Sequence, residues 1–435
     1  MFAERYRSHH DAERRLHEAL GRGNKAAAPV PWSQVEKALG EKPRGKSRAV
    51  YIHVPHCDRI CAFCNLNRKE RKDADLAAYT EYLIAEIAAY GAYPYIREQA
   101  FDAVYFGGGT PTVLDTEPLT RILRALRDEL PLKEDCEITL ESTQHNLSIE
   151  KALALQEAGV NRLSIGIQTF APEGRKLFNR TYDAERSRAA LQALREHFRG
   201  TLGIDIIYSY PGQSLEALGD DADTAAAMKV DSVSFYSLMI QEGSALGRGM
   251  PRREGENETP GTSFTRTIEW DKERHHLFYS RLREAGFTLL ELSKLARPGK
   301  DRYQYIHTLY ENGDLLPIGS GAGGKIAGFP VFSLAPGRRF VSPPQERYER
   351  YYTVLGYLQF GLYEPERIAA ALGKPAEWAA PALGEKLRFF ADAGLLEQRT
   401  EGSGYRLSAD GVFWGNNLAV EILKAAIAAE QGREE

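Results

Sequence analysis

The feature that most constrains this chain is a regular alternation of short apolar runs with longer amphipathic stretches, which begins at Arg48. The runs are rich in Val, Ile, Tyr and Phe, as buried strands are. In the stretch after the first run, Leu76, Leu83 and Ile87 fall on one helical stripe. Six strands are predicted in this way, over residues 49–54, 101–106, 137–141, 162–167, 204–208 and 232–236. Because a helix follows each strand, we predict an α/β fold, a partial (β/α)6 barrel with its chemistry at the carboxyl ends of the strands.

The segments around this repeat divide the chain into four predicted regions. Residues 1–47 are charged and Ala-rich and predict an N-terminal helical extension, with His9 and His10 on a solvated helix face. Residues 48–250 form the partial barrel. Residues 251–342 are predicted to form a barrel extension with substrate-side loops, because 300–342 are rich in Gly and Pro. The polar stretch 240–265 predicts a loop or lid. Residues 343–435 predict a mostly helical, winged-helix-like cap, with two strand-like pieces around EGSG.

Composition excludes several classes of protein. The 435 residues carry 56 basic and 60 acidic side chains, so the chain lacks the excess of positive charge that is typical of nucleic-acid-binding proteins. No run approaches the roughly 18 apolar residues of a membrane-spanning helix, and the N-terminus is too charged for a secretory signal. We therefore expect a cytoplasmic protein without a membrane span. Four cysteines are too few for a disulfide scaffold, and the isolated Cys136 is expected to be a small buried apolar side chain.

The other three cysteines are the main chemical signal. Cys57, Cys61 and Cys64 follow the first strand with the spacing C-x3-C-x2-C. Clustered thiolates select zinc or iron–sulfur centres. A structural zinc site needs a fourth ligand, for which His53 and His56 are candidates. Three thiolates can instead hold a [4Fe-4S] cluster with one open iron, which can chelate the amino and carboxylate groups of S-adenosylmethionine.

A glycine run after the second strand, in FGGGTPT, favours the cluster over zinc because it lets the backbone approach a bound ligand closely. From Tyr51 to about Gly247 the sequence resembles the coproporphyrinogen-dehydrogenase-like branch of radical S-adenosylmethionine enzymes. The matching elements are, in order, YIHVPHCDRICAFC, VYFGGGTPTVL, ITLEST, GVNRLSIGIQTF, LFNR, IDIIY and PGQ. The resemblance implies a radical S-adenosylmethionine barrel in which the three cysteines are catalytic cluster ligands.

The resemblance also implies the residues that bind the cofactor. Tyr51 and Phe63 would flank the cluster-bound S-adenosylmethionine, and Glu141 would accept a hydrogen bond from its amino group. Its methionyl amino end would be cradled by Gly107, Gly108, Gly109 and Thr110. Its carboxylate and ribose would be held by Gln168, Arg180 and Asp205. Carboxylates suit an ammonium group and hydroxyls, and Arg suits a carboxylate. Taken singly, Glu141 and Asp205 could instead cap helices, and Arg180 could form a surface ion pair.

Within this branch, the second half of the chain looks most like the anaerobic heme-degrading methyltransferases. Residues 302–324 read RYQYIHTLYENGDLLPIGSGAGG where heme chaperones carry HNxxYW, and the ending LSADGVFWGNNL is also similar. This resemblance implies that two molecules of S-adenosylmethionine are used to methylate heme and open it to a linear tetrapyrrole, with release of iron. The alternatives are a heme chaperone, an oxygen-independent coproporphyrinogen dehydrogenase, methylation of another aromatic compound, and a structural zinc protein.

A heme or related tetrapyrrole substrate would meet further side chains in the second half of the chain. His307 is a candidate iron ligand, and Arg302 and Lys325 are candidate partners of propionates. A hydrogen-bonded structural histidine and two solvated charges are the alternatives. The family resemblance also implies a low-potential electron donor such as flavodoxin, and a monomer.

Overall fold

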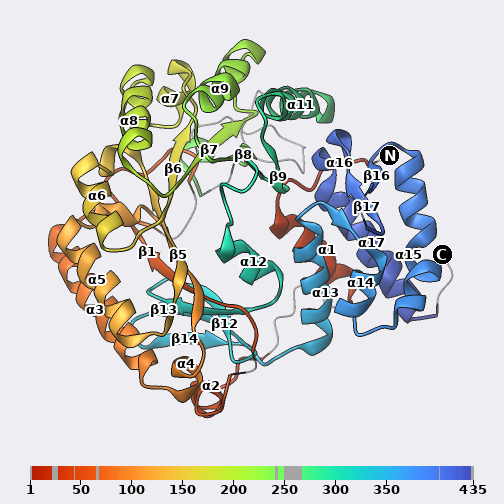
Figure 1. Ribbon diagram of the computed structural model, residues 1–435, viewed down its shortest axis with the longest axis horizontal. Coiled ribbons are helices and arrows are strands. Elements are labelled where there is room, and N and C mark those ends of the chain that lie inside the picture. Colours follow the sequence, from red (N-terminus) through yellow and green to blue (C-terminus); the bar gives the residue numbers. More distant parts are fainter. Residues whose placement is uncertain are drawn as a thin grey trace.

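The structure is a computed structural model that describes residues 2–21, 28–43, 45–64, 68–240, 243–248, 267–400 and 402–432. Its main feature is a twelve-stranded sheet that curves around helix α12 (Gln304–Tyr310), with helices on the outer face (Figure 1). The six predicted strands are present and lie side by side in chain order, each parallel to the next. They are β1 (Arg48–Val54), β4 (Phe101–Gly108), β5 (Leu132–Ser142), β6 (Arg162–Gln168), β7 (Thr201–Tyr208) and β8 (Ser232–Ser237). The predicted α/β partial barrel is confirmed, while most of the predicted lid over 240–265 lies outside the described residues.

Helices on the outer face connect successive strands. In α3 (Asp73–Gly91), the predicted stripe of Leu76, Leu83 and Ile87 is buried against the sheet and its neighbouring helices. The other helices of this layer are α4 (Pro94–Arg97), α5 (Thr116–Glu129), α6 (Ile149–Glu157), α7 (Pro172–Leu177), α8 (Ala184–His197) and α9 (Leu215–Ala227). None of the described helices is both long and apolar enough to cross a lipid bilayer.

The sheet extends beyond the six strands at both edges. β11 (Asp314–Ile318) runs parallel to β1 and adds a seventh parallel strand, which the sequence pattern did not predict. Antiparallel strands continue the sheet from there as β12 (Gly323–Ile326), β13 (Phe329–Ala335) and β14 (Arg338–Val341). At the other edge, β10 (Lys294–Ala296) and β9 (Thr288–Glu291) continue from β8. Across the described residues β14 and β9 are the end strands and do not pair with each other, so the barrel is open.

Helix α12 lies inside the curve of the sheet. Asp301, just before it, accepts two hydrogen bonds of 2.9 Å from Arg162 at the start of β6. Tyr303 then adopts a left-handed conformation, with φ of 45°. The helix places the ring of Tyr305 on that of Tyr105, with 4.3 Å between their centroids. The segment therefore starts at the amino-terminal end of β6 and fills part of the barrel interior.

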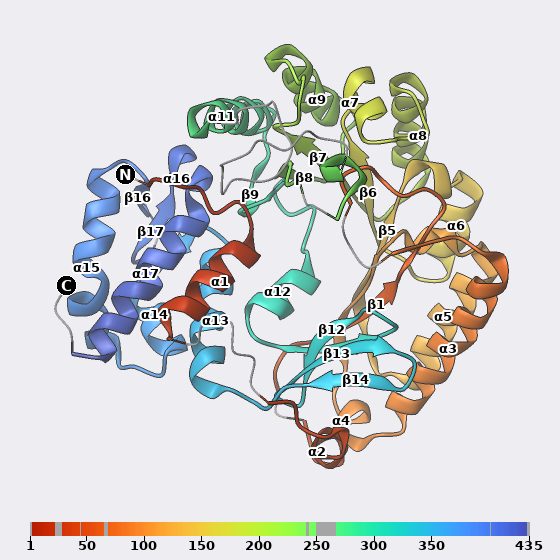
Figure 2. The same ribbon diagram turned by 180° about the vertical axis from the view of Figure 1, so that it is seen from behind.

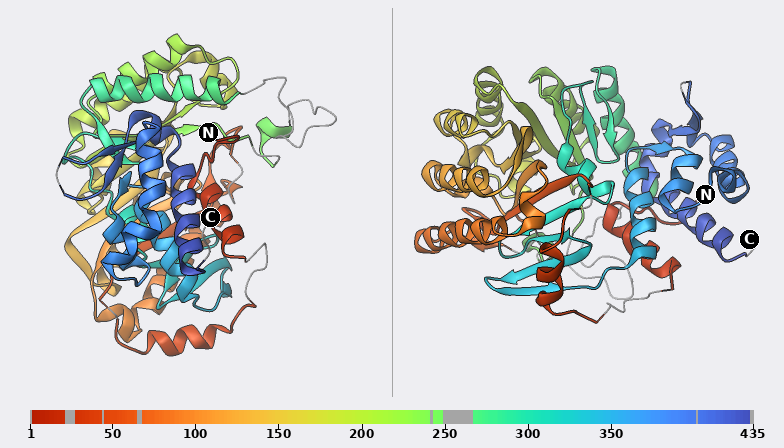
Figure 3. Two further views of the ribbon diagram at one scale, coloured as in Figure 1. Left: turned by 90° about the vertical axis from the view of Figure 1, so that its right-hand side faces the viewer. Right: turned by 60° about the horizontal axis from the view of Figure 1, so that its bottom comes forward.

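The C-terminal region is mostly helical and carries a small sheet, and it lies beside the barrel (Figures 1 and 3). The two pieces predicted around EGSG are β16 (Leu396–Gln398) and β17 (Tyr405–Leu407), and they pair antiparallel. A third strand, β15 (Leu362–Tyr363), also pairs with β17. The helices are α13 (Glu346–Leu358), α14 (Pro365–Ala371), α15 (Ala376–Asp392), α16 (Ala409–Phe413) and α17 (Gly415–Glu430). This arrangement agrees with the expected helical cap.

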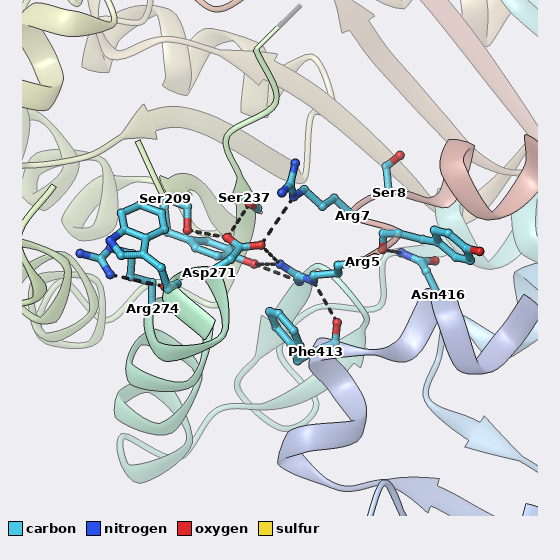
Figure 4. A network of polar contacts seen from close by, with 12 residues as sticks. Arg5, Arg7, Ser8, Ser209, Ser237, Asp271, Arg274, Phe413 and Asn416 are labelled. Atoms are coloured by element: carbon cyan, nitrogen blue, oxygen red, sulfur yellow. Dashed lines mark hydrogen bonds and ion pairs between the residues drawn. The ribbon is translucent and has the colours of Figure 1, made fainter. Parts of the chain in front are cut away.

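The N-terminal segment is tied to both the barrel and the C-terminal region. It contains α1 (His9–Ala19), which packs against α13 and α17, and α2 (Trp32–Leu39). Arg5 forms a buried ion pair with Asp271 of α11 (Ile268–Glu284), with 2.7 Å between nitrogen and oxygen (Figure 4). The Arg5 guanidinium also donates to the Phe413 carbonyl and lies 3.9 Å from the centroid of the Phe413 ring. One side chain thus joins three parts of the chain that are distant in sequence.

The solvated helix face predicted for His9 and His10 is wrong for His9. The His9 ring packs against Tyr310 of α12 and Tyr352 of α13. His10, one position on, points outward with 89% of its side chain exposed. The amphipathic pattern of residues 1–47 did not show that this helix is covered by two distant helices.

Candidate functional site

Three cysteine side chains lie at the carboxyl end of β1. Cys57 is buried in the short strand β2 (His56–Cys57), which pairs with β3 (Lys69–Glu70), and Cys61 and Cys64 follow it in the loop. The Thr110 hydroxyl donates to Cys57 Sγ across 3.6 Å, and Arg180 donates to Cys61 Sγ across 3.3 Å. Segments that follow β4 and β6 therefore hold the cysteine loop from two sides.

The donor set fits an iron–sulfur cluster better than a single metal ion. Among the described residues, no three His, Cys, Asp or Glu side chains lie close enough together to hold one metal ion. The proposed zinc ligands have other contacts: His53 Nδ1 is 3.1 Å from the Tyr51 hydroxyl, and the His56 ring packs edge-on against Tyr79. Thiolates of a four-iron cluster bind different iron atoms and need not converge on one point. Burial raises the pKa of the Cys57 thiol to about 11, and the positive charge of a bound metal centre would offset that shift.

The glycine run after β4 lies between the cysteine loop and a buried carboxyl group. A β-carbon on Gly109 would lie 2.6 Å from the His56 carbonyl oxygen, so only glycine allows this approach. Gly108 has a φ of 108°, which also favours glycine. A β-carbon on Gly107 would lie 3.1 Å from the Glu141 carboxylate. The backbone that was predicted to cradle the cofactor therefore packs directly against the segment of the cysteines and against the Glu141 carboxylate.

Two carboxyl groups face the barrel interior near this run. Glu141, at the end of β5, accepts a hydrogen bond of 2.6 Å from the Tyr105 hydroxyl. Asp205, in β7, accepts one of 3.4 Å from Ser164. Burial, and then the charge of Asp205, raise the pKa of Glu141 to about 7, although hydrogen bonds from Tyr105 and the Gly108 backbone act in the opposite direction. A cationic group bound between the two carboxyls would relieve their repulsion, so this part of the site suits an ammonium ligand.

Two further predicted residues lie on the next segment of the rim. Gln168 ends β6 in a left-handed conformation, with φ of 73°. Arg180 follows α7 and donates to the Gly166 carbonyl as well as to Cys61. The guanidinium therefore connects the end of β6 to the cysteine loop, a position from which it can face a bound carboxylate.

Aromatic side chains complete the rim. Phe63, in the cysteine loop, packs edge-on against Phe178, with 5.2 Å between centroids. Tyr51 projects from β1 into the interior, where its ring centroid is 6.3 Å from that of Tyr105. All of the residues predicted to hold the cluster and the cofactor thus belong to loops and strand segments around one barrel interior.

The three residues predicted to contact the substrate lie away from the cysteine loop, and their roles stay predictions. Arg302 forms an exposed ion pair with Asp135, with 2.7 Å between nitrogen and oxygen, near the amino-terminal end of β5. Lys325 donates to Asn312 just before β11, also at the amino-terminal end of the parallel strands. The His307 ring is stacked on Phe360, with 4.4 Å between centroids. Sequence alone did not reveal that the segment runs from one end of the barrel to the cap.

Tyrosines that the sequence analysis did not assign line the interior beside the two carboxyls. Tyr236 lies on the same strand face as Ser234, whose hydroxyl accepts from the buried Lys294. Enclosure by the barrel wall, and then the charges of Asp205, Glu291 and Glu141, raise the pKa of Tyr236, although 42% of the residue remains exposed. The side chain is therefore surrounded by protein and still reached by solvent, so the interior is open beside it. For Tyr303, Tyr305 and Tyr310 the sequence signal is their close spacing in RYQYIHTLY, whereas Tyr236 has no comparable signal.

Comparisons with known proteins agree with this geometry. The sequence profile of the radical SAM superfamily matches residues 51–225. The chain is 30% identical over 411 residues to the anaerobilin synthase of Escherichia coli O157:H7, which covers 91% of this chain and 88% of the relative. It is 29% identical to the heme chaperone HemW of Escherichia coli strain K12, over 80% of this chain and 87% of the relative. The solved structure of coproporphyrinogen III oxidase (HemN) from Escherichia coli has a TM-score of 0.74 and 19% identity, and the match covers 92% of this chain and 95% of that chain.

The superfamily match runs from β1 to α9 and so contains the cysteine loop, the glycine run and both carboxyl groups. Radical SAM proteins use a [4Fe-4S] cluster and S-adenosylmethionine, and the thiols and the rim described above fit both groups. The two relatives also extend over the N-terminal or C-terminal regions outside this match. The chain therefore belongs to the radical SAM superfamily and to its HemN-like branch.

Proposed function

We propose that the protein is a radical S-adenosylmethionine methyltransferase that methylates heme and opens it anaerobically to a linear tetrapyrrole, with release of iron and the use of two molecules of S-adenosylmethionine. The observation that carries this proposal is the match to an anaerobilin synthase over 91% of the chain. A match of that extent includes the interior helix α12 and the C-terminal region as well as the cofactor-binding strands. The absence of an HNxxYW stretch in residues 302–324 supports an enzyme over a carrier.

The barrel interior supports a flat aromatic substrate. Tyr51 and Tyr305 each lie near Tyr105, with 6.3 and 4.3 Å between ring centroids. Tyr236, with 42% of the residue exposed, adds a further tyrosine on the strand next to Asp205. Aromatic rings of this kind favour stacked or edge-on contact with another planar ring system.

Different residues of the rim would bind the cluster and the separate groups of the cofactor. Cys57, Cys61 and Cys64 would hold the [4Fe-4S] cluster, and when bound it supplies the electron that cleaves S-adenosylmethionine. Glu141 would accept a hydrogen bond from the amino group, and Arg180 would face the carboxylate. The remaining contacts with this cofactor would come from Tyr51, Phe63, Gly107, Gly108, Gly109, Thr110, Gln168 and Asp205. A low-potential donor such as flavodoxin, and a monomeric protein, complete the proposal.

Replacement of Glu141 by Gln should stabilise the cofactor-free protein and weaken cofactor binding. The folded-state pKa of about 7 is above the ordinary 4.5, so this carboxyl favours unfolding once it ionises. Below pH 4.5 the two proteins should be equally stable, and above pH 7 E141Q should be more stable by roughly 3 kcal/mol. Loss of the charge-assisted hydrogen bond should weaken S-adenosylmethionine binding about ten- to a hundredfold at pH 8. Denaturant unfolding between pH 5 and 8, and equilibrium dialysis, measure the two effects.

The matched control is Glu117→Gln, on the exposed face of α5. It makes the same chemical change at an exposed carboxyl. The pH dependence of the unfolding free energy and the affinity for the cofactor should therefore equal those of the wild type. Wild-type cofactor affinity in E141Q would show that Glu141 is a structural residue only.

A heme chaperone is the second candidate, and a specific observation favours it. The relative HemW is 29% identical over 80% of this chain, nearly the same identity as the anaerobilin synthase. Oxygen-independent coproporphyrinogen dehydrogenation is the third, and its support is the shared fold with HemN. The three functions differ in what happens to the tetrapyrrole, so product analysis separates them.

The test is anaerobic incubation of reconstituted protein with heme, a low-potential reductant and S-adenosylmethionine that carries a deuterated methyl group. Mass spectrometry should find a methylated linear tetrapyrrole, with deuterium in both the tetrapyrrole and the deoxyadenosine. S-adenosylhomocysteine should form alongside deoxyadenosine, because one molecule of S-adenosylmethionine gives each product. Iron should be released as the Soret band disappears.

A carrier would return intact heme and label neither product. A dehydrogenase would act on coproporphyrinogen, release carbon dioxide and give unlabelled deoxyadenosine. Either of these results would overturn the proposed heme opening, and the cluster assignment would stand.

A further inference from the structure

His9, the first residue of α1, has a buried nitrogen atom that no described residue satisfies. Its Nδ1 atom has no hydrogen-bond partner in the part of the chain that the structure describes, and Nε2 lies 3.3 Å from the Tyr352 hydroxyl. The ring centroid is 5.2 Å from that of Tyr310 and 5.5 Å from that of Tyr352. Because a buried polar atom without a partner costs free energy, a bound group that would satisfy it has to be considered.

Tyr310 connects His9 to the barrel interior. After burial, the charges of Glu291, Tyr352, Tyr236 and Tyr305 raise the pKa of Tyr310, so the residue lies within electrostatic reach of side chains that border the interior. Tyr236 is the inward-facing side chain that solvent reaches. Figures 1 and 2 both show α1 between α12 and the C-terminal helices. His9 therefore lies at the border between the interior and the C-terminal region.

The backbone that carries His9 is held in place. The Ser8 hydroxyl accepts from the Asp11 amide and caps α1. Four positions before His9, Arg5 is ion-paired with Asp271 (Figure 4). An imidazole on such an anchored helix start is positioned well enough to act as a metal ligand.

We infer that His9 supplies an imidazole ligand to the iron of the heme substrate. The inference rests on the proposed function, because heme is the substrate only there. A ligating histidine binds metal through one ring nitrogen, while the other donates to a group that fixes the tautomer. If the Nε2–H group of His9 donates to the Tyr352 hydroxyl oxygen, the lone pair of Nδ1 is left for iron.

The charge state of His9 agrees with this role. Burial lowers its pKa to about 4, although Glu13 acts in the opposite direction, so the imidazole is neutral at pH 7. Neutral imidazole is the form that binds metal ions. His307, the ligand predicted from the sequence, has its ring stacked on Phe360 instead.

The test is binding of ferric heme to the reconstituted full-length protein, without reductant or S-adenosylmethionine, so that no turnover occurs. Loss of outer-shell partners weakens metal sites about tenfold or more, and His9→Ala removes the ligand itself, so heme affinity should fall at least as far. The Soret band and the EPR signal of the ferric heme should also change, and added imidazole should restore both. The affinity for metal-free protoporphyrin should stay the same, because it has no iron. His10→Ala changes the exposed neighbour and should alter none of these measurements.

An equal loss of affinity for heme and for metal-free protoporphyrin in His9→Ala would show that His9 is a packing contact, and would overturn the inference. Identical heme spectra for His9→Ala and the wild type would also overturn the inference. If the alanine variant does not retain its iron–sulfur cluster, His9→Gln provides the same comparison with a larger side chain. Failure of the wild type to bind heme would overturn the proposed function as well. Normal heme opening by a His9 variant whose heme spectra are unchanged would overturn only the role of His9.

Discussion

Replacement of Cys57, Cys61 and Cys64 by Ala should abolish iron loading and the formation of deoxyadenosine, and should leave a folded protein. Thiolates are the cluster ligands, so without them the cluster has no attachment. Cys57 lies in the short strand β2 and Cys61 and Cys64 in the loop after it, while the core is made by the long strands and the helices that cover them. Iron content, the brown colour of the cluster and deoxyadenosine yield after anaerobic reconstitution measure the loss, and circular dichroism measures the fold.

Cys136→Ala is the matched control for this experiment. Cys136 is buried in the hydrophobic core, as its isolated position in the sequence predicted, and lies in β5 far along the chain from the cysteine loop. Its replacement should leave iron content and deoxyadenosine formation unchanged. Full cleavage of S-adenosylmethionine by the triple variant would contradict the cluster assignment.

The parallel strands were predictable because their pattern is local. A strand buried on both faces is a short apolar run, and the helix after it has a stripe such as Leu76, Leu83 and Ile87. The seventh parallel strand, β11, was missed for a physical reason. Its sequence DLLPI contains a proline, and it pairs with β1, more than 250 positions earlier, a contact that no local period encodes.

The candidate site likewise contains residues that could be predicted from the sequence and residues that could not. The residues of the cluster and the cofactor lie at strand ends, and a parallel barrel brings strand ends together whatever the details of packing. The substrate contacts depend on how the segment from Asp301 to Tyr310 crosses the barrel, and that path is set by contacts between distant residues. His307 and Arg302 are therefore placed away from the rim, while the positions of Tyr305 and His9 could not be predicted from any local pattern.

Replacement of Asp301 by Asn should be among the most destabilising changes in the chain. Asp301 and Arg162 are both buried, with 0% and 1% of their side chains exposed, and are joined by two hydrogen bonds of 2.9 Å. Breaking such a pair leaves a buried charge without its partner, at a cost of about 3–5 kcal/mol. The Asp301 carboxylate also accepts from the Tyr303 amide at 3.0 Å, which fixes the start of α12. Both the free energy of unfolding and heme binding should therefore fall.

Asp135→Asn is the control, because Asp135 pairs with the neighbouring Arg302 but both partners are exposed, by 72% and 55%. Loss of such a surface pair should cost only about 0–1 kcal/mol. The pH dependence separates the two cases further. Burial acts to raise the pKa of Asp301, but the charge and hydrogen bonds of Arg162, Lys294 and Ser232 outweigh it and hold that pKa below its ordinary 3.8. The stabilisation is therefore present above pH 4 and is lost as the pH falls below it. The difference between wild type and Asp301→Asn, measured by denaturant unfolding, should therefore be constant from pH 6 to 8 and shrink only in acid. A difference no larger than that of Asp135→Asn would show that this buried pair does not hold α12 in the barrel.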